Sequence, residues 1–262
     1  MKREQYILLS FDVEEFDMPL EYQHPIAVEE QMQVGKAGLD ALRPLLSDPQ
    51  LVTTLFTTAH FAEQFPVHIQ DLSGQHEIAS HTFYHSSFED AHLIQSKQSL
   101  EAITGKPVSG LRMPRMRPVA MEAVKKAGYT YDASINPTWL PGRYNNLHLS
   151  RRYYQDQGML RVPASVSPVI RFPLFWLSFK NLPYTIFRSL ALRALHRDGY
   201  LSLYFHPWEF VDISGYGMPQ YTWRHAGPVL LERLYRLVND LKKQARFISM
   251  QDFTHHIQKD PA

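Results

Sequence analysis

The sequence of 262 residues contains no cysteine. Disulfide bonds, zinc–thiolate sites and cysteine nucleophiles are therefore excluded, and His, Asp and Glu remain as the plausible ligands for a metal ion. Long apolar runs are also missing, since no segment approaches the roughly 18 apolar residues of a membrane-spanning helix. The sequence has no Gly/Ser tract, low-complexity run or internal repeat. We therefore expect residues 1–262 to form a single domain without a linker.

The chain also lacks an excess of charge of either sign. Its formal net charge is +1, which gives no reason to expect a nucleic acid partner. The apolar run over residues 6–9 is too short for the core of a secretory signal, and acidic residues follow it closely. These features predict a cytoplasmic protein, with peripheral contact at the inner membrane face as an alternative.

Predicted strands and helices alternate along most of the chain. Strands are expected at residues 6–11, 51–57, 77–80, 108–112, 129–134, 160–163, 200–205 and 245–249. Helices are expected at residues 27–46, 59–65, 86–103, 119–127, 184–197 and 229–244. Such alternation favours a parallel sheet, and the length suits one α/β barrel. Hydrophobic residues make up 44% of the chain, enough for a sizeable core.

Polar residues lie at or close to the carboxyl ends of five predicted strands. They are Asp12, His81, Arg112, Asp132 and His206. Active sites of α/β barrels lie at the carboxyl ends of the strands. We therefore expect these five side chains to converge at one mouth.

His81 and His85 are the first candidate metal ligands. On a helical turn, a spacing of four residues places both imidazoles on one face, close enough to share an ion. A third, carboxylate ligand is available in an acidic cluster composed of Asp12, Glu14, Glu15 and Asp17. Residues two apart in a strand share a face, so Asp12 and Glu14 can both reach the mouth. The third ligand is one of these two, whereas Glu15 and Asp17 are expected to be solvated.

Five ordered motifs between Ser10 and Glu209 resemble those of one family. They are Ser-Phe-Asp12-Val-Glu14, His81-Thr-Phe-Tyr-His85, Gly110-Leu-Arg112-Met-Pro114-Arg115, Tyr131-Asp132-Ala-Ser134 with Trp139, and Leu201-Ser-Leu-Tyr-Phe-His206-Pro-Trp208. Together they resemble the polysaccharide deacetylase (NodB homology) family, which is carbohydrate esterase family 4-like. The second acid stands two residues after Asp12, as in the Asp-Val-Glu branch of that family. Arg115 stands where the family usually has Tyr.

The resemblance implies a fold, a reaction and a ligand set. The fold is a distorted TIM-like (β/α)7 barrel, and the reaction is metal-dependent hydrolysis of an N-acyl group, acetyl or formyl, on an amino sugar or glycan precursor. By the family pattern Glu14 joins His81 and His85 as a ligand, and Asp12 is the general base. The ion expected is Zn²⁺, with Co²⁺, Ni²⁺ and Fe²⁺ as alternatives.

The remaining roles follow from residue type. His206 is the candidate general acid because the pKa of histidine lies near working pH. Arg112 is expected to keep Asp12 ionised, and Asp132 to orient and charge His206. Arg115, through its backbone N–H, is a candidate oxyanion donor. Substrate contacts are also expected from Trp139 and Trp208.

One segment and three rival functions remain open. The apolar stretch at residues 172–179 is expected to be core under the barrel, with a membrane or lipid-linked glycan surface as the alternative. The rivals are a metal-free hydrolase of cyclic amides or imides, a non-haem iron oxygenase and a catalytically inactive glycan-binding barrel.

Overall fold

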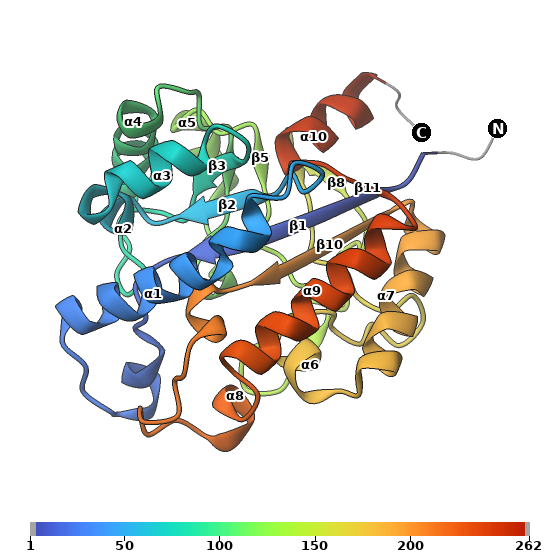
Figure 1. Ribbon diagram of the computed structural model, residues 1–262. Helices are drawn as coiled ribbons and strands as arrows, with labels where there is room; N and C mark the ends of the chain where they lie inside the picture. The colour runs from blue at the N-terminus through green and yellow to red at the C-terminus, as the bar shows by residue number, and fades with distance from the viewer. Residues whose placement is uncertain (1–3, 260–262) are drawn as a thin grey trace.

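Seven parallel strands form the centre of the fold (Figure 1). A computed structural model describes residues 4–259. In chain order the seven strands are β1 (Tyr6–Val13), β2 (Thr54–Thr57), β3 (Glu77–Ser80), β4 (Gly110–Leu111), β5 (Tyr131–Asp132), β9 (Met159–Arg161) and β10 (Tyr200–Phe205). Across the sheet the order is β10-β1-β2-β3-β4-β5-β9. The two outer strands are thus consecutive in the chain, as in a barrel.

The barrel closes only loosely. β9 and β10 share no ladder, but the N–H of Ser165 donates to the carbonyl of Ser202 at 2.9 Å and so links the two edges. Two short strands extend the sheet: β8 (Tyr154–Asp156) runs antiparallel to β9, and β11 (Arg246–Phe247) pairs with β1. A separate hairpin is formed by β6 (Trp139–Leu140) and β7 (Tyr144–Asn145). The predicted distorted (β/α)7 barrel is confirmed.

Helices lie around the outside of the sheet (Figure 1). They are α1 (Val28–Leu46), α2 (Ala59–Gln64), α3 (Pro66–Leu72), α4 (Ala91–Thr104), α5 (Met121–Lys126), α6 (Trp176–Asn181), α7 (Tyr184–Asp198), α8 (Gln220–Trp223), α9 (Pro228–Lys242) and α10 (Met250–Lys259). Short 3-10 helices follow strand ends at η1 (Met18–Tyr22), η2 (Pro114–Met116) and η3 (Pro207–Phe210).

The alternation of side chains along β1 places its acids at the mouth. Ile7, Leu9, Phe11 and Val13 belong to the large core between sheet and helices, whereas Leu8 belongs to the smaller cluster inside the barrel. Successive side chains of a strand point to opposite faces, so the inward row that starts at Leu8 continues through Ser10 and Asp12. Along β1, the inward row is therefore apolar at Leu8 and becomes polar at Ser10 and Asp12, toward the carboxyl end of the strand.

Two glycines bring α1 against the backbone of the mouth. A Cβ at Gly35 would lie 2.5 Å from the carbonyl oxygen of Glu14, and one at Gly38 would lie 2.1 Å from that of Pro207. Real side chains cannot approach so closely. The two glycines therefore allow one helix to support both the end of β1 and the start of η3.

Several predicted boundaries were wrong. The helix predicted at residues 59–65 ends at Gln64, but a second helix, α3, begins directly at Pro66, where a missing N–H costs nothing. α4 begins at Ala91 instead of residue 86, because residues 86–90 form a connection. Residues 135–159, for which no helix or strand was predicted, contain the β6–β7 hairpin and β8. Four helices, α3, α6, α8 and α10, were not predicted.

The apolar stretch at residues 172–179 belongs to the core, as predicted, but it lies beside the mouth. None of its residues is exposed, Leu174 and Phe179 are part of the large core, and Phe175, Trp176 and Leu177 line the pocket. Within residues 4–259, no helix has the length and apolar character needed to cross a membrane. The predicted cytoplasmic location stays a prediction.

Candidate active site

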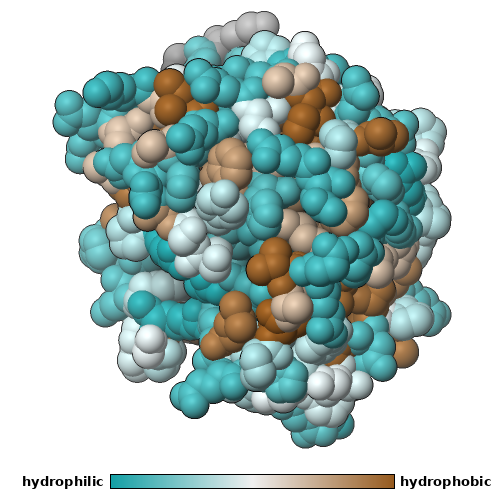
Figure 2. All heavy atoms as spheres, turned by 90° about the vertical axis from the view of Figure 1, so that its left-hand side faces the viewer, coloured by the Kyte–Doolittle hydropathy of each residue, from teal (hydrophilic) through white to brown (hydrophobic). Residues whose placement is uncertain are grey.

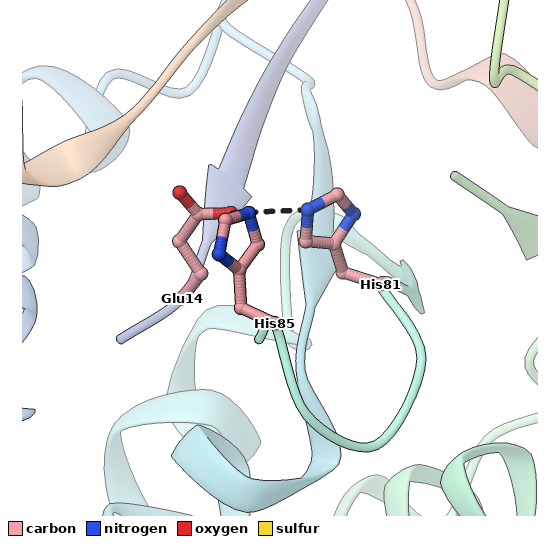
Figure 3. A group of neighbouring side chains, drawn as sticks. All are labelled: Glu14, His81 and His85. Carbon is pink, nitrogen blue, oxygen red and sulfur yellow. Dashed lines mark ion pairs between the residues drawn. The ribbon is translucent and has the colours of Figure 1, made fainter. Parts of the chain in front are cut away.

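Glu14, His81 and His85 converge on one point at the mouth (Figure 3). Oε2 of Glu14 lies 3.0 Å from Nε2 of His81 and 3.1 Å from Nε2 of His85. All three side chains are buried, and their ligand atoms lie within 4.8 Å of one another. Of the two candidate third ligands, Glu14 is the one beside the histidines. Two imidazoles and one carboxylate match the donor set of catalytic zinc sites, which keep one position for water.

The surroundings leave all three donor atoms available for an ion. Nδ1 of His81 donates to the carbonyl of Arg112 at 2.7 Å, and Nδ1 of His85 lies 2.7 Å from Oδ1 of Asp17. Each contact directs the lone pair of Nε2 toward Glu14. Buried Oε2 of Glu14 accepts no hydrogen bond from any residue the structure describes. A divalent cation would satisfy this oxygen, so the residues fit a metal.

The loop from His81 to His85 is not a helical turn. Thr82 has φ +64°, and its N–H donates to Oγ of Ser80 at 3.1 Å, so the chain reverses sharply between the two histidines. Their rings nevertheless stack, with centroids 5.6 Å apart. The spacing correctly predicted that the two imidazoles lie close together, but the helical reason for it was wrong.

Glu15 and Asp17 are buried instead of solvated. Glu15 accepts from the N–H of His85 at 2.9 Å and from Oγ1 of Thr58 at 2.6 Å, which anchors the histidine loop to α2. Burial would lower the pKa of His85, but the charges of Glu14 and Asp17 beside it raise that pKa to about 9. The acids that were expected to face water therefore orient a ligand.

Asp12 forms a buried ion pair with Arg112. Nη1 of Arg112 donates to Oδ1 of Asp12 at 2.6 Å and to Oγ of Ser10 at 2.9 Å, as the predicted pairing requires. Burial would raise the pKa of Asp12, but the charges of Arg112, His81 and His206 hold it below its usual value. The second oxygen of Asp12 lies 3.9 Å from Nε2 of His206. A carboxylate base and an imidazole thus face each other across the mouth.

Glu209, and not Asp132, is the partner of His206. Oε1 of Glu209 accepts from the backbone N–H of His206 at 2.9 Å and lies 3.1 Å from its Nδ1. The predicted contact between Asp132 and His206 is wrong. Asp132 instead accepts from Oγ of Ser134 at 2.5 Å and from Nε of Arg161 at 2.8 Å, because its side chain at the end of β5 faces the neighbouring strand β9.

The two tryptophans predicted to bind substrate have different positions. Nε1 of buried Trp208 donates to Oε1 of Glu14 at 3.1 Å, and its ring stacks on His206 with centroids 4.6 Å apart. Trp139 is 59% exposed and does not line the pocket, because it belongs to the outer side of the β6–β7 hairpin. Trp208 therefore supports the site, and the expected contact of Trp139 has no geometric basis.

Arg115 lines the pocket, and its guanidinium group forms ion pairs with two acids. Its Nη2 lies 2.9 Å from Oδ2 of Asp17, and its Nε lies 2.5 Å from Oε1 of Glu21. Its φ of +55° reverses the chain after Pro114. Within residues 4–259 its backbone N–H makes no hydrogen bond.

The pocket has a polar floor and apolar walls. The floor contains Asp12, Glu14, His81, His85 and His206, and the walls contain Met18, Met113, Leu140, Phe175, Trp176 and Tyr204. In Figure 1 the carboxyl ends of β1 and β2 point to the left. Figure 2 views that side, where apolar side chains gather in the centre and lower half among hydrophilic ones.

Sequence reasoning missed four residues of the site. They are Asp17, Trp176, Lys180 and Glu209. Glu209 had a detectable signal, since a glutamate three residues after a polar residue is the spacing of a capping box. Lys180 and Trp176 had none, because they come from a helix that was not predicted.

Comparisons with known proteins support the family that the motifs indicate, and the sequence match covers the first three of them. Residues 2–131 match the sequence model of polysaccharide deacetylase. The structure resembles a putative polysaccharide deacetylase from Mycobacterium smegmatis (TM-score 0.68, 16% identity, 99% of this chain and 92% of that chain). It also resembles a probable polysaccharide deacetylase from Pseudomonas aeruginosa PAO1 (TM-score 0.69, 16% identity, 98% and 91%). A third similar structure is Puue allantoinase (TM-score 0.64, 18% identity, 98% and 91%).

A comparison with curated protein sequences found no match. At these identities, the similar structures establish the fold alone. The family follows from the sequence match over residues 2–131 together with a deacetylase fold that extends over nearly the whole chain. The chain belongs to the polysaccharide deacetylase family.

Proposed function

We propose that this protein is a metal-dependent hydrolase that removes an N-acyl group, most simply acetyl, from an amino sugar or glycan precursor. The observation that carries the proposal is the arrangement of Glu14, His81 and His85 around one point. A carboxylate and an imidazole, Asp12 and His206, lie on the adjacent floor of the same pocket. We also propose that the chain acts as one catalytic domain, since these residues come from strand ends between residues 12 and 206.

Glu14, His81 and His85 would hold the ion. Zn²⁺ suits this nitrogen and oxygen donor set, and Co²⁺, Ni²⁺ and Fe²⁺ remain alternatives. When bound, such an ion supplies a Lewis acid for the acyl carbonyl. Three contacts pre-orient these ligands: Nδ1 of His81 with the carbonyl of Arg112, Nδ1 of His85 with Asp17, and Nε1 of Trp208 with Glu14.

Asp12 would be the general base. Its ion pair with Arg112 keeps it ionised despite complete burial, so it can accept a proton from the attacking water. His206, 3.9 Å away, would give a proton to the leaving amine. Burial would lower the pKa of His206, but Glu209, Glu14 and Asp12 raise it above its ordinary value, which favours the protonated form needed in an acid. The free N–H of Arg115 is the candidate oxyanion donor.

The experiment is release of acetate or formate from a panel of nucleotide-linked and lipid-linked amino sugars, with and without chelator. We expect release from at least one substrate, its loss with chelator and its return with Zn²⁺. Activity that survives complete metal removal would contradict the metal-dependent reaction. Cyclic amides and imides belong in the same panel, because a metal-free hydrolase of this fold would open them in the presence of chelator.

A further inference from the structure

A second buried ion pair lies behind His206, on the side away from Asp12. Oε2 of Glu209 lies 3.0 Å from Nζ of Lys180, and neither side chain is exposed to solvent. Lys180 belongs to α6 and Glu209 to η3, so the pair joins two segments that are far apart in the chain. Cation, carboxylate, imidazole, carboxylate and cation alternate from Lys180 through His206 to Arg112.

The environment of Lys180 holds it as an ammonium ion. Its Nζ donates to the carbonyl of Thr222 at 2.6 Å, lies beside Glu209 and sits 5.0 Å from the centroid of the Trp176 ring. Two oxygens and one aromatic face thus surround a group with three N–H donors. Lysine is almost never fully buried without such partners.

Stability alone does not account for this pair. Two charges removed from water lose several kcal/mol of solvation each, and apolar residues of similar volume often replace a buried ion pair with neutral or favourable effect. The surrounding helices offer apolar packing for such residues, since Phe179 beside Lys180 already belongs to the core. Packing and stability alone therefore give no reason for a charged residue at position 180.

The charge of Lys180 affects which group carries the proton shared by Glu209 and Nδ1 of His206. A fully buried carboxylate without a cation tends to take up a proton. Burial would raise the pKa of Glu209, but the charges of Lys180 and His206 hold it below its usual value. If Glu209 were neutral, its proton would come from Nδ1, and His206 would keep only the weakly acidic Nε2–H of a neutral imidazole. With Glu209 ionised, the same proton stays on Nδ1 and the ring is an imidazolium.

We propose that Lys180 is a positioning residue of the reaction: its ammonium keeps Glu209 ionised, which holds a proton on Nδ1 of His206 and leaves an acidic Nε2–H facing the pocket. This inference rests on the proposed function, because it concerns the acid of that reaction. The charged and titratable groups around His206 are Glu209 and Lys180 on one side, Asp12 in β1 and Glu14 just after β1 on the other, and Tyr204.

The first test is the protonation state of His206 in the Zn²⁺-loaded protein, measured by nitrogen NMR with ¹⁵N-histidine. The signals of His206 are assigned by their absence in H206N. We expect Nδ1 to be protonated in the wild type at neutral pH, both before and after Nε2 loses its proton. A neutral ring protonated only on Nε2 would overturn the proposal without any variant at Lys180.

The second test compares K180M with K180M/E209Q. In K180M the proton moves to Glu209 and Nδ1 becomes unprotonated, and kcat falls about 10- to 100-fold, less than the 10²- to 10⁴-fold value of a whole proton-transfer role. In the double variant the neutral glutamine can still accept from Nδ1, so we expect the Nδ1–H signal to return and kcat to recover in part. An Nδ1 signal in K180M like that of the wild type would contradict the inference, as would equal loss of kcat in both variants.

Folding and function are separated within the same experiment. The double variant leaves no unpaired charge, so it provides a folded protein even if K180M does not fold, and the wild-type spectrum needs neither. Thermal unfolding and zinc content identify a merely structural effect, which would lower both without moving the Nδ1 proton. If no substrate releases acetate or formate with the wild type, the proposed function fails, while the NMR result still decides whether Lys180 controls this proton.

Discussion

The pocket has a metal side, formed by Glu14, His81 and His85, and an acid side, formed by His206 and Glu209. The histidines of the two sides make the same kind of contact at Nδ1. Nδ1 of His81, His85 and His206 each faces an oxygen, from a carbonyl, Asp17 and Glu209 respectively. The difference lies at Nε2. In His81 and His85 this atom is about 3 Å from Oε2 of Glu14, whereas in His206 it lies 3.9 Å from Asp12, a carboxylate already paired with Arg112.

This difference separates ligands from an acid. Two Nε2 atoms and an oxygen without a hydrogen bond form a place for a cation, and an ion there would displace any proton from the imidazoles. The carboxylate that faces Nε2 therefore distinguishes the histidines. Oε2 of Glu14 accepts no hydrogen bond within residues 4–259, whereas Asp12 opposite His206 is already paired with Arg112. In the proposed function this contrast makes His81 and His85 ligands and His206 an acid.

The largest expected effect comes from Asp12 in β1 and Glu14 just after it. E14Q should lose the ion, since an amide is a weaker ligand, and activity should fall to that of the chelated protein. D12N should keep the ion but lose about 10²- to 10⁴-fold in kcat, because only proton transfer is removed. Zinc content and kcat of both variants check this. Loss of zinc in D12N with retention in E14Q would reverse the assignment of ligand and base.

The acid side is tested by H206N. We expect kcat to fall about 10²- to 10⁴-fold with unchanged zinc content, because His206 lies outside the ligand set. The same variant should keep the affinity for substrate within a few-fold. A loss of zinc comparable to that of E14Q would place His206 on the metal side and break the distinction between the two.

The orienting acids of the metal side should have a smaller effect. D17N removes the negative charge that faces Nδ1 of His85. We expect the zinc affinity to fall about 10- to 100-fold, and excess zinc to restore the occupancy of the site. E21Q is the matched control, because Glu21 shares Arg115 with Asp17 but does not contact His85. Competition titrations with a chelating dye measure both. Equal affinities in D17N and E21Q would contradict the orienting role.

The pH dependence of kcat provides a further test of the pairing between His206 and Glu209. His206 acts in its protonated form, and its raised pKa means that activity declines only as pH increases beyond the ordinary value of about 6.5. E209Q removes the adjacent negative charge, so the pKa of His206 should fall and the alkaline decline should begin at lower pH. A shift to higher pH in E209Q, or none, would be inconsistent with this pairing.

Trp139 should have the smallest effect. Its ring is mostly exposed and outside the pocket wall, so W139A should change KM and kcat by less than about twofold, as exposed positions usually do. W208F is the informative counterpart, since it removes only the hydrogen bond to Glu14 and should weaken zinc binding. A large rise of KM in W139A would restore the predicted substrate contact.

The sequence predicted the metal side better than the acid side. Asp12, Glu14, His81 and Arg112 follow predicted strands, and parallel strands bring their carboxyl ends to one edge whatever the loops do. Lys180 and Glu209 depend on α6 and η3, which pack against the barrel from segments without a clear period. Asp132 follows a strand as well, but its side chain meets Arg161 from the neighbouring strand, a contact that no motif encodes.

The sequence by itself determined which row of side chains faces the barrel interior and where that row becomes polar, because the period of a strand is local. The alternation from Leu8 to Asp12 and the spacing of His81 and His85 are of this kind. Only the tertiary structure decided which oxygen faces each Nδ1 and which carboxylate has a cation. These depend on approaches between distant segments, such as α1 reaching Glu14 and Pro207 through Gly35 and Gly38.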